Sequence, residues 1–437
     1  MEYFSIMNRL FNKPVLLFFS LYINMKFCEN IRILKENQKI ILSNPGNGAW
    51  IKLNEEVYEI INGYVMNDGQ YNNAFFDDFN NEDREYLKKI INIIQKIGIV
   101  DFVFEDCITR ADFAITSLCN LKCRHCCNSV MESNKEPASG EIISVLNKLH
   151  KAGIKQLCLT GGEPLLRDDF SKITLTAKNL FVKLDLMTNG TLISKDNVNF
   201  LCNNFGSINI SIDGYDSYSC EKIRGKGVFQ KVVNAINLLH KNNYDNILLS
   251  AVTNSYNDIG KFYRLCESLK VTPIVRRYAP SGRGFENEKE LFIPEFNLEY
   301  QKNKELSDYI LENNINYGYN KYATTVCNAF MGSIYIGSDL YIYPCGALNL
   351  PEFKCDNMME INDIDIYFHN KMYENSSGYK KYISIKPENA SYCKNCSVYI
   401  FCNNCPLYLY LYEKNGYLDK YCVECKEHMK RKIYGYN

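Results

Sequence analysis

The segment SLCNLKCRHCCNSV at residues 117–130 brings three cysteines together in a CxxxCxxC spacing, at Cys119, Cys123 and Cys126. Three thiolates from one short turn can hold an iron–sulfur cubane and leave one iron with an open coordination position. Zinc sites usually close with four ligands, and His125 lies between two of the cysteines, where it cannot easily become the fourth. Cys127 follows Cys126 directly, so its side chain should diverge from the same centre as buried filler. The spacing favours an iron–sulfur cluster.

This segment opens a long stretch in which strand and helix patterns alternate. The candidate strands lie at residues 112–116, 156–160, 183–187, 207–212, 247–252 and 271–277. Between the first two, Ser139 is placed to cap a helix that ends at Gly153. Such alternation is typical of βα units on a parallel sheet, whose functional loops follow the carboxyl ends of the strands. The sequence therefore predicts an α/β fold with a site at those strand ends.

Short motifs follow the next three strands. The second strand ends in a GGEP turn, made by Gly161, Gly162, Glu163 and Pro164. The third ends in Thr188, Asn189 and Gly190, and the fourth in Ser211, Ile212, Asp213 and Gly214, with Arg224 in the segment that follows. Paired glycines let backbone approach a ligand closely, and Glu163 offers a carboxylate to a cationic group.

Together with the CxxxCxxC loop, these motifs resemble those of the radical S-adenosylmethionine (SAM) superfamily. Its members bind SAM at the open iron of a [4Fe–4S] cluster and cleave it to a 5′-deoxyadenosyl radical. The resemblance implies a (β/α)6 partial TIM barrel over residues 106–284, with the cluster on Cys119, Cys123 and Cys126. It implies SAM contacts from Gly161, Gly162, Glu163, Pro164, Asn189, Ser211, Asp213 and Arg224, in which Glu163 meets the ammonium and Arg224 the carboxylate of SAM. Pro280, Gly282, Arg283 and Gly284 give a weaker match to the turn that closes the sixth strand.

Residues 285–437 lose the regular alternation and are rich in Cys, Tyr and Asn. The run CKNCSVYIFCNNCP contains Cys393, Cys396, Cys402 and Cys405, with Cys327 and Cys345 upstream and Cys422 and Cys425 downstream. Paired CxxC elements suit metal ligation, by zinc or by iron–sulfur clusters. We expect metal ligands to take the place of a hydrophobic core in this region.

The cysteine-rich run is similar to the SPASM extension of radical SAM enzymes, which binds auxiliary iron–sulfur clusters. The resemblance implies a first auxiliary cluster on Cys327, Cys345 and Cys405, and a second on Cys393, Cys396, Cys402 and Cys422. Leu340 stands where the extension usually has a glycine. Three ligands are evident for the first cluster. Its fourth position is therefore either an open iron or filled by a non-cysteine ligand or by Cys355. Cys425 is the alternative to Cys422 in the second.

Residues 26–105 combine strand patterns at 31–34, 39–43 and 49–53 with two helix patterns, one capped by Asn54 and one ending before Gly98. This pattern indicates a small α+β domain. It resembles the winged-helix-like recognition domain of enzymes that modify ribosomally made peptides, in which an exposed strand pairs with the leader of a precursor peptide. A generic α+β domain with another role is the alternative.

Composition narrows the partners and the compartment. The chain has 437 residues, with 50 Lys plus Arg and 50 Asp plus Glu, so no overall field favours nucleic acid or a membrane surface. Its 19 cysteines are clustered, and the chain is longer than disulfide-dependent secreted domains, which favours a reducing cytoplasm. The apolar run Val15–Ile23 is too short to span a bilayer. We interpret residues 1–25 as an N-terminal extension, either tolerated or arising from a mis-assigned start before Met25.

The resulting hypothesis is a radical SAM enzyme that modifies a precursor peptide, with thioether formation as the expected reaction and a flavodoxin or ferredoxin as reductant. A sulfatase-type maturase of folded proteins is one alternative, and the front domain counts against it. A non-catalytic iron–sulfur electron carrier is another, and the GGEP and SIDG motifs count against that. No general base or radical relay can be assigned among the 33 tyrosines and Trp50.

Overall fold

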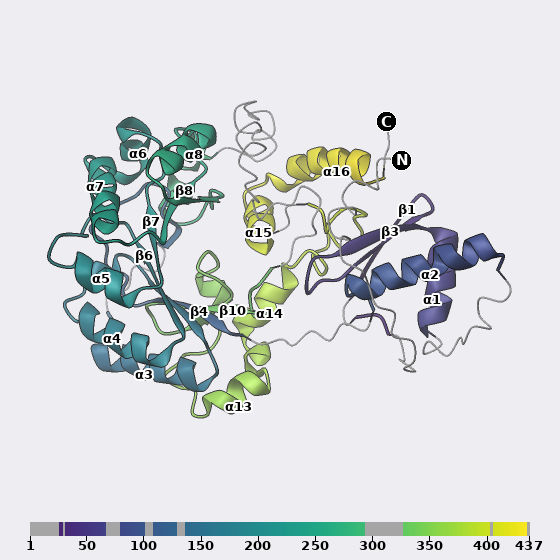
Figure 1. Cartoon of the computed structure of the whole chain (residues 1–437), viewed down its shortest axis with the longest axis horizontal. Helices are drawn as coiled ribbons and strands as arrows, with labels where there is room; N and C mark the ends of the chain where they lie inside the picture. Colours follow the sequence, from purple (N-terminus) through teal and green to yellow (C-terminus); the bar gives the residue numbers. More distant parts are fainter. Residues whose placement is uncertain are drawn as a thin grey trace. The chain divides into compact units, whose positions relative to one another are not determined.

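The computed structural model describes residues 26–28, 31–66, 79–100, 108–128, 136–292, 327–402 and 405–434. The N-terminal extension at 1–25 lies outside these described residues. The chain divides into two compact units, Met1–Phe104 and Glu105–Asn437 (Figure 1). Each unit has its own hydrophobic core.

The first unit packs a three-stranded antiparallel sheet against two helices. The sheet has the order β1 (Arg32–Glu36), β2 (Lys39–Ser43), β3 (Trp50–Asn54), and the helices are α1 (Glu55–Met66) and α2 (Asn81–Lys96). The predicted cap is confirmed, because Asn54 Oδ1 accepts a hydrogen bond from the Val57 N–H (2.7 Å). Buried aliphatic side chains from β2, β3 and both helices form the core.

The second unit is built on an eight-stranded sheet with the order β11-β10-β4-β5-β6-β7-β8-β9. The six strands expected from the sequence are all present and parallel: β4 (Arg110–Ala114), β5 (Gln156–Thr160), β6 (Lys183–Thr188), β7 (Ser207–Ser211), β8 (Ile247–Val252) and β9 (Thr272–Arg276). Their alternation with helices confirms the α/β fold class. The carboxyl ends of these strands therefore meet at one edge of the sheet.

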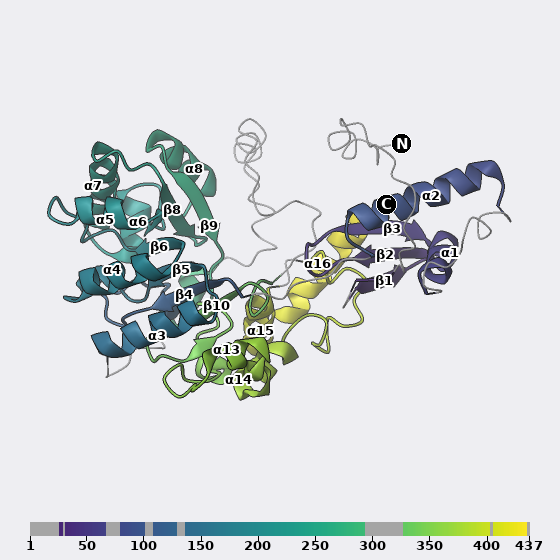
Figure 2. The ribbon, with the colours of Figure 1, turned by 60° about the horizontal axis from the view of Figure 1, so that its bottom comes forward.

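Helices cover the outer face of this sheet (Figures 1 and 2). They are α3 (Ser139–Lys151), α4 (Phe170–Leu180), α5 (Val198–Asn204), α6 (Ser217–Arg224), α7 (Val228–Lys241) and α8 (Ile259–Ser268). The prediction that Ser139 caps α3 is wrong. Ser139 is the first helical residue and Ala138 is the N-cap, whose N–H donates to the Glu141 carboxylate (2.8 Å). An acid in the first turn supplies the capping bond here, in place of a cap hydroxyl.

The rest of the second unit consists of short elements and one helix of 17 residues, α16. They are α9 (Arg283–Glu286), α10 (Glu288–Leu291), β10 (Ser333–Ile336), β11 (Ile342–Tyr343), η6 (Pro351–Phe353), α13 (Ile364–His369), η7 (Met372–Asn375), α14 (Ser377–Ser384), α15 (Pro406–Lys414) and α16 (Leu418–Tyr434). β10 pairs in parallel with β4, and β11 pairs antiparallel with β10. The cysteine-rich region thus adds a strand beside the strand that precedes the CxxxCxxC loop.

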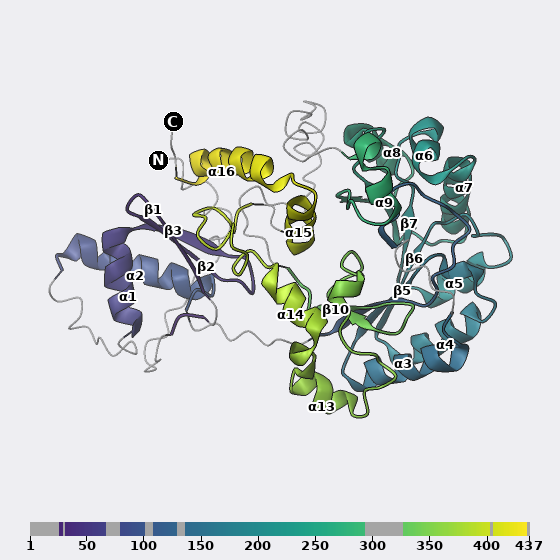
Figure 3. The same ribbon diagram turned by 180° about the vertical axis from the view of Figure 1, so that it is seen from behind.

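The expectation that metal ligands replace a core in this region is wrong. Side chains such as Ile336, Phe353 and Leu411 are buried and belong to the same hydrophobic cluster as the barrel strands. Figure 3 shows α13 and α14 beside β10. The short β10 escaped the sequence argument because its four residues carry too little of a strand pattern. Within the described ranges, no helix is long and apolar enough to cross a membrane.

Candidate active site

The CxxxCxxC loop leaves the carboxyl end of β4. Cys119 is exposed, Cys126 is partly exposed and Cys123 is buried, and all three line one cavity of about 380 Å3. Burial raises the pKa of the Cys123 thiol to about 11, and burial also raises the pKa of Cys119. These thiols are therefore protonated at neutral pH until a metal displaces the protons.

The donor chemistry of this cavity fits an iron–sulfur cluster with three protein ligands. Cys127 does not line the cavity, as expected from its position next to Cys126. His125 turns away to contact Asp213. In the described part of the chain, no three His, Cys, Asp or Glu side chains are arranged to hold a single metal ion. A four-iron cluster spreads its thiolates more widely than one ion does, so three thiols on one cavity wall suit the cluster.

The GGEP turn packs directly on the cluster loop. The Gly162 N–H donates to the Thr116 carbonyl (2.8 Å), and the Glu163 N–H donates to the Leu118 carbonyl (2.7 Å). A Cβ on Gly161 would collide with the Thr116 carbonyl, and one on Gly162 with the Leu118 carbonyl. The glycines are thus required for contact between two stretches of backbone, although both also line the cavity.

Glu163 is fully buried and its carboxylate holds three donors. It accepts from the Thr188 hydroxyl (2.7 Å), the Asn189 N–H (2.7 Å) and the Leu165 N–H (3.1 Å). Burial raises the pKa of Glu163, although these hydrogen bonds oppose that shift. Pro164 begins the short turn η5 (Pro164–Leu166) that Glu163 caps. The carboxylate therefore joins the GGEP turn to the TNG turn.

Asn189 connects the TNG turn to the cluster loop. Its Nδ2 donates to Asn120 Oδ1 (2.8 Å) and lies 3.9 Å from Cys119 Sγ. Asn120 also donates to the Thr191 hydroxyl (2.9 Å). The predicted SAM contact Asn189 thus lies next to a predicted cluster ligand.

Asp213, in the SIDG turn, is the centre of a buried charge group. Its Oδ2 contacts both His125 Nε2 and Arg224 Nε, and its Oδ1 accepts from the Val252 N–H (2.6 Å). Burial alone would raise the pKa of this carboxyl, but Arg224 and His125 outweigh burial and hold it well below its usual range. Arg224 also places Nη1 3.8 Å from Cys123 Sγ. The two residues expected to contact SAM are therefore already paired with each other beside the cluster loop.

Ser211 ends β7, one strand away from β6. Its hydroxyl lies 3.4 Å from the Ser250 hydroxyl on β8. Of the predicted SAM contacts, Gly161 and Gly162 line the cavity with the three cysteines, whereas Ser211, Asp213 and Arg224 do not. Glu163 and Asn189 reach the cluster loop through hydrogen bonds, whereas the Pro164 carbonyl accepts from the Arg167 N–H.

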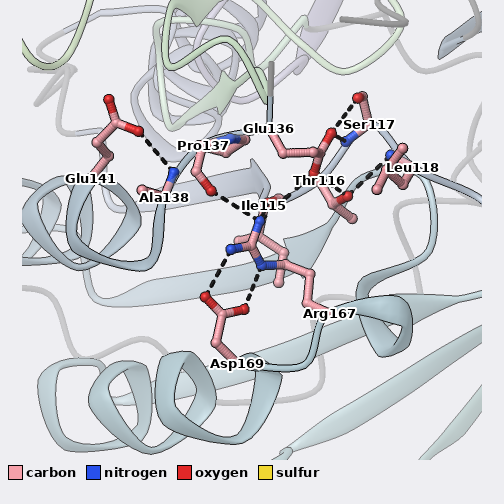
Figure 4. Close-up of polar contacts among 10 residues, drawn as sticks. All are labelled: Ile115, Thr116, Ser117, Leu118, Glu136, Pro137, Ala138, Glu141, Arg167 and Asp169. Atoms are coloured by element: carbon pink, nitrogen blue, oxygen red, sulfur yellow. Dashed lines mark hydrogen bonds and ion pairs between the residues drawn. The ribbon is translucent and has the colours of Figure 1, made fainter. Parts of the chain in front are cut away.

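Arg167, one turn after the GGEP motif, fastens the beginning of the cluster loop (Figure 4). Its guanidinium binds Asp169 in a bidentate pair, with N···O distances of 2.7 and 2.8 Å. Its Nη1 donates to the carbonyls of Ile115 (3.0 Å) and Pro137 (3.1 Å). Arg167 thus holds the end of β4 against the segment that leads into α3.

Glu136 lies beside this arginine and accepts hydrogen bonds from the next two residues, Thr116 and Ser117 (Figure 4). Its carboxylate accepts from the Thr116 hydroxyl (2.5 Å), the Ser117 N–H (2.9 Å) and the Ser117 hydroxyl. The far side of the loop is held by α9 and α10. There Arg283 Nε donates to the Cys123 carbonyl (3.1 Å), and Arg124 pairs with Glu290.

The structure gathers the cysteines of the first predicted auxiliary site. Cys327, Cys345 and Cys405 are electrostatic neighbours, and burial raises the pKa of Cys345 to about 12 and that of Cys405 to about 11. The thiol of Cys355 has Ser376, Asp356 and Tyr379 as its neighbours instead. Cys355 is therefore outside this group.

The second group contains five thiols. Cys393 has Cys422 and Cys396 as neighbours, and Cys422 also neighbours Cys425. Cys402 makes its strongest contact with Cys425. The structure thus brings together Cys393, Cys396, Cys402, Cys422 and Cys425. The choice between Cys422 and Cys425 stays open.

Several residues of this site were not predicted. The pairing of His125 with Asp213 joins residues far apart in the sequence, as do the contacts of Glu136 and Arg124. No motif marks them. The Arg167–Asp169 pair has a weak local signal, because an arginine two residues before a helix-starting aspartate is placed to reach it.

Comparison with known proteins agrees with this geometry. Residues 113–266 match the model of the radical SAM superfamily. A GTP 3′,8-cyclase of Psychromonas ingrahamii is 31% identical over 144 residues, which are 32% of this chain and 42% of the relative. The sporulation killing factor maturation protein SkfB of Bacillus subtilis is 27% identical over 253 residues, 54% of this chain and 60% of that protein. The chain thus spans about half the length of these curated relatives.

The crystal structure of Streptococcus suis SuiB bound to S-adenosylmethionine has a similar fold. It matches with a TM-score of 0.54 and 20% identity over 88% of this chain and 96% of SuiB. The family match coincides with β4 to α8, the part of the chain that carries the CxxxCxxC loop and the GGEP, TNG and SIDG turns. The chain therefore contains a radical SAM domain.

Proposed function

We propose that the protein is a radical SAM enzyme that modifies a ribosomally made precursor peptide. The observation that carries this proposal is the single cavity where Cys119, Cys123 and Cys126 meet the GGEP turn. When bound, the [4Fe–4S] cluster supplies the electron that cleaves SAM to methionine and a 5′-deoxyadenosyl radical. A non-catalytic electron carrier needs the cysteines but not the GGEP turn on the same cavity.

The residues around the cavity hold SAM and keep the cluster loop in place. Arg224 does not line the cavity, since its Nε faces Asp213 and its Nη1 lies 3.8 Å from Cys123 Sγ; we assign it to the SAM carboxylate from its place after the SIDG turn. Glu163 and Asn189 fix the GGEP and TNG turns beside the cluster loop. Asp213 keeps Arg224 oriented, since a buried guanidinium without a counter-ion would be costly.

The cysteine groups of the second unit fit two auxiliary clusters. Cys327, Cys345 and Cys405 supply three thiolates for one, and the five-cysteine group supplies four for the other. A chain with three clusters in one unit needs a reductant, and we assign that role to a flavodoxin or ferredoxin. These clusters and thiols fit a reducing cytoplasm.

A peptide substrate is supported by the relatives and by the first unit. SkfB is named a maturation protein, and SuiB has been solved bound to its precursor peptide SuiA. The GTP cyclase of Psychromonas ingrahamii matches 32% of this chain, whereas SkfB matches 54%. A second GTP cyclase matches 53% of the chain, so the peptide class is favoured by the fold of SuiB, which covers 88% of it.

We assign leader binding to an edge strand of the first unit, by β-augmentation. β1 and β3 are the edges of the sheet. The Asn44 N–H donates to the Ala49 carbonyl, and the Glu55 N–H donates to the Gln38 carbonyl. Since hydrogen-bonded pairs alternate in antiparallel sheets, the backbone of Lys52 on β3 and of Ile33 on β1 faces away from β2.

The leader assignment is tested with the full chain and the peptide encoded by a neighbouring short reading frame. Lys52→Pro and Ile33→Pro each remove one outward N–H and leave the ladder to β2 intact. We expect one of them to weaken peptide binding in a calorimetric titration, and that variant identifies the edge. Wild-type affinity in both variants would overturn the assignment, with circular dichroism confirming that each is folded.

Thioether formation is the reaction we propose. One hydrogen atom would pass from a peptide carbon to the 5′-deoxyadenosyl radical, which becomes 5′-deoxyadenosine. The thiol would give up its proton, and the electron released as the C–S bond forms would be taken up by an iron–sulfur cluster. The test is anaerobic turnover of the reconstituted protein with SAM, reductant and peptide. We expect 5′-deoxyadenosine and a peptide that has lost two hydrogens and one free thiol. Absence of 5′-deoxyadenosine would end the enzyme proposal, and a modified peptide that keeps its free thiol would end the thioether proposal.

A further inference from the structure

Arg276, the last residue of β9, lies on the inner face of the sheet, opposite the face that the helices cover. Its Nη2 is 4.0 Å from the sulfur of Met187 on β6, although β7 and β8 lie between these two strands in the sheet. Leu184 and Leu186 of β6 are buried in the hydrophobic core with residues of α4, and alternation along a strand places Met187 on the other face. The Arg276 side chain is exposed, so a molecule inside the barrel can reach it.

The same arginine lies close to the cluster loop. Burial raises the pKa of the Cys127 thiol to about 12 and that of Cys158 on β5 well above its usual range, and the positive charge of Arg276 opposes both shifts. Cys127 directly follows the predicted cluster ligand Cys126. Arg276 therefore lies beside the loop at which we propose that the radical is generated.

The backbone that carries Arg276 is held by two neighbouring elements. Its carbonyl accepts a hydrogen bond from the Thr253 N–H (2.8 Å), directly after β8. The carbonyl of the next residue, Arg277, accepts from the Tyr408 hydroxyl on α15 (3.0 Å), and the Arg277 guanidinium lies over the Tyr408 ring. A fixed backbone restricts where the Arg276 guanidinium can lie, which reduces the entropy lost when it binds a ligand.

Arg276 has no acidic partner among the residues that the structure describes. Its contact with a thioether sulfur on β6 is weak, because such a sulfur is a poor hydrogen-bond acceptor. Two aspartates on the inner face are engaged by other groups. Asp112 pairs with Arg110 (3.0 Å), and Asp185 accepts from the Ser207 hydroxyl (2.6 Å). Arg276 therefore presents an uncompensated positive charge inside the barrel.

We propose that Arg276 binds a carboxylate of the precursor peptide. This inference rests on the proposed function and adds a charged specificity contact to it. A guanidinium offers parallel N–H donors in a planar fork that matches the two oxygens of a carboxylate. An Asp or Glu side chain and the C-terminus of the peptide both present this group. Binding at Arg276 would hold that part of the peptide beside the cluster loop and limit which C–H bonds the radical can reach.

The test is a double-mutant cycle in anaerobic turnover of the full chain, read as kcat/KM for the peptide. Arg276→Gln removes the charge, and Arg276→Lys keeps the charge but loses the fork. Each variant is assayed with the native peptide, with peptides in which each Asp or Glu in turn is replaced by Asn or Gln, and with the peptide amidated at its C-terminus. Arg264→Gln is the control, since Arg264 is exposed on α8, one of the helices on the outer face.

For Arg276→Gln with the native peptide we expect kcat/KM to fall roughly tenfold or more, which corresponds to the loss of a charged hydrogen bond. Arg276→Lys should show a smaller fall, and Arg264→Gln none. One of the neutralised peptides should show the same fall with the wild-type enzyme and no further fall with Arg276→Gln. That peptide identifies whether the carboxylate belongs to a side chain or to the C-terminus.

An unchanged kcat/KM in Arg276→Gln would overturn the inference. Equal falls with every peptide would also overturn it, since Arg276 would then recognise no peptide carboxylate. A rise in the KM for SAM that matches the fall in kcat/KM would assign Arg276 to SAM and overturn it as well. A wild-type protein that modifies no peptide would instead overturn the proposed function.

Discussion

The phenolic hydroxyl of Tyr382 donates a hydrogen bond to the sulfur of Cys327 across 3.4 Å. Tyr382 is buried on α14 and also reaches the Ala329 carbonyl (3.4 Å). Burial raises the pKa of this phenol well above its usual range, so it remains a donor at neutral pH. Hydrogen bonds to cluster sulfurs raise reduction potentials, because they stabilise the more negative reduced state. Tyr382 is therefore placed to tune the auxiliary cluster that we propose on Cys327.

Tyr382→Phe should lower the reduction potential of that auxiliary cluster, by an amount on the order of tens of millivolts for one lost hydrogen bond. The measurement is a potentiometric titration followed by electron paramagnetic resonance, in a chain whose Cys119, Cys123 and Cys126 are replaced by alanine. Tyr379→Phe is the matched control, since Tyr379 lies on the same helix and donates to Glu374 (3.1 Å). An equal shift in both variants would contradict the assignment.

Cys123→Ala should abolish 5′-deoxyadenosine formation and remove about four irons per chain, because one missing thiolate leaves a three-ligand cluster with two. Iron analysis and chromatography of the turnover mixture report both effects. Cys202→Ala is the control, since Cys202 on α5 lines no part of the cavity. Persistent SAM cleavage in Cys123→Ala would show that the cluster is not held by the loop after β4.

Gly162→Ala should destabilise the fold by about 1–3 kcal/mol and reduce SAM cleavage, since the added methyl group meets the Leu118 carbonyl in the cluster loop. Gly140→Ala, on α3, has no atom within 4 Å of the new Cβ and should be neutral or slightly stabilising. Urea unfolding measures both. Equal stability in the two variants would show that the GGEP turn tolerates a side chain.

The Arg167–Asp169 pair gives a prediction that depends on pH. The hydrogen bond from Arg167 lowers the pKa of Asp169 in the folded chain. The pair therefore stabilises the fold above the unfolded-state pKa of about 4, and its contribution is lost as the pH falls through the folded-state value. Asp169→Asn should cost about 1 kcal/mol at pH 7 and progressively less below pH 4, measured by urea unfolding of the apoprotein. Asp168→Asn, at the exposed neighbouring position, is the matched control for the loss of a carboxylate.

The barrel could be predicted from the sequence because its evidence is local. β5 and β8 coincide with the expected strands, and the GGEP motif follows β5 directly. The two helices of the first unit could be predicted for the same reason. Asn54 caps the start of one helix through its side chain, and Gly98 ends the other with a positive φ. Local signals of this kind need no knowledge of what packs against them.

The rest depends on contacts between distant parts of the chain. Nothing near Asp213 in the sequence indicates that His125 is its partner. The predicted Ser139 cap of α3 is wrong because the capping hydrogen bond in the structure joins the Ala138 N–H to the Glu141 carboxylate, and a serine pattern does not indicate that bond. β10 was not predicted because its four residues form a strand through their pairing with β4, a contact that their own sequence does not indicate.

The place of β10 beside β4 bears on how the domain could be isolated. β4 is held on one side by β5 and on the other by β10, which lies beyond residue 292. A chain cut at the end of the barrel pattern would turn the strand that carries the cluster loop into an open edge, with unpaired backbone groups that invite aggregation. A minimal soluble fragment of this domain must therefore include residues 333–336.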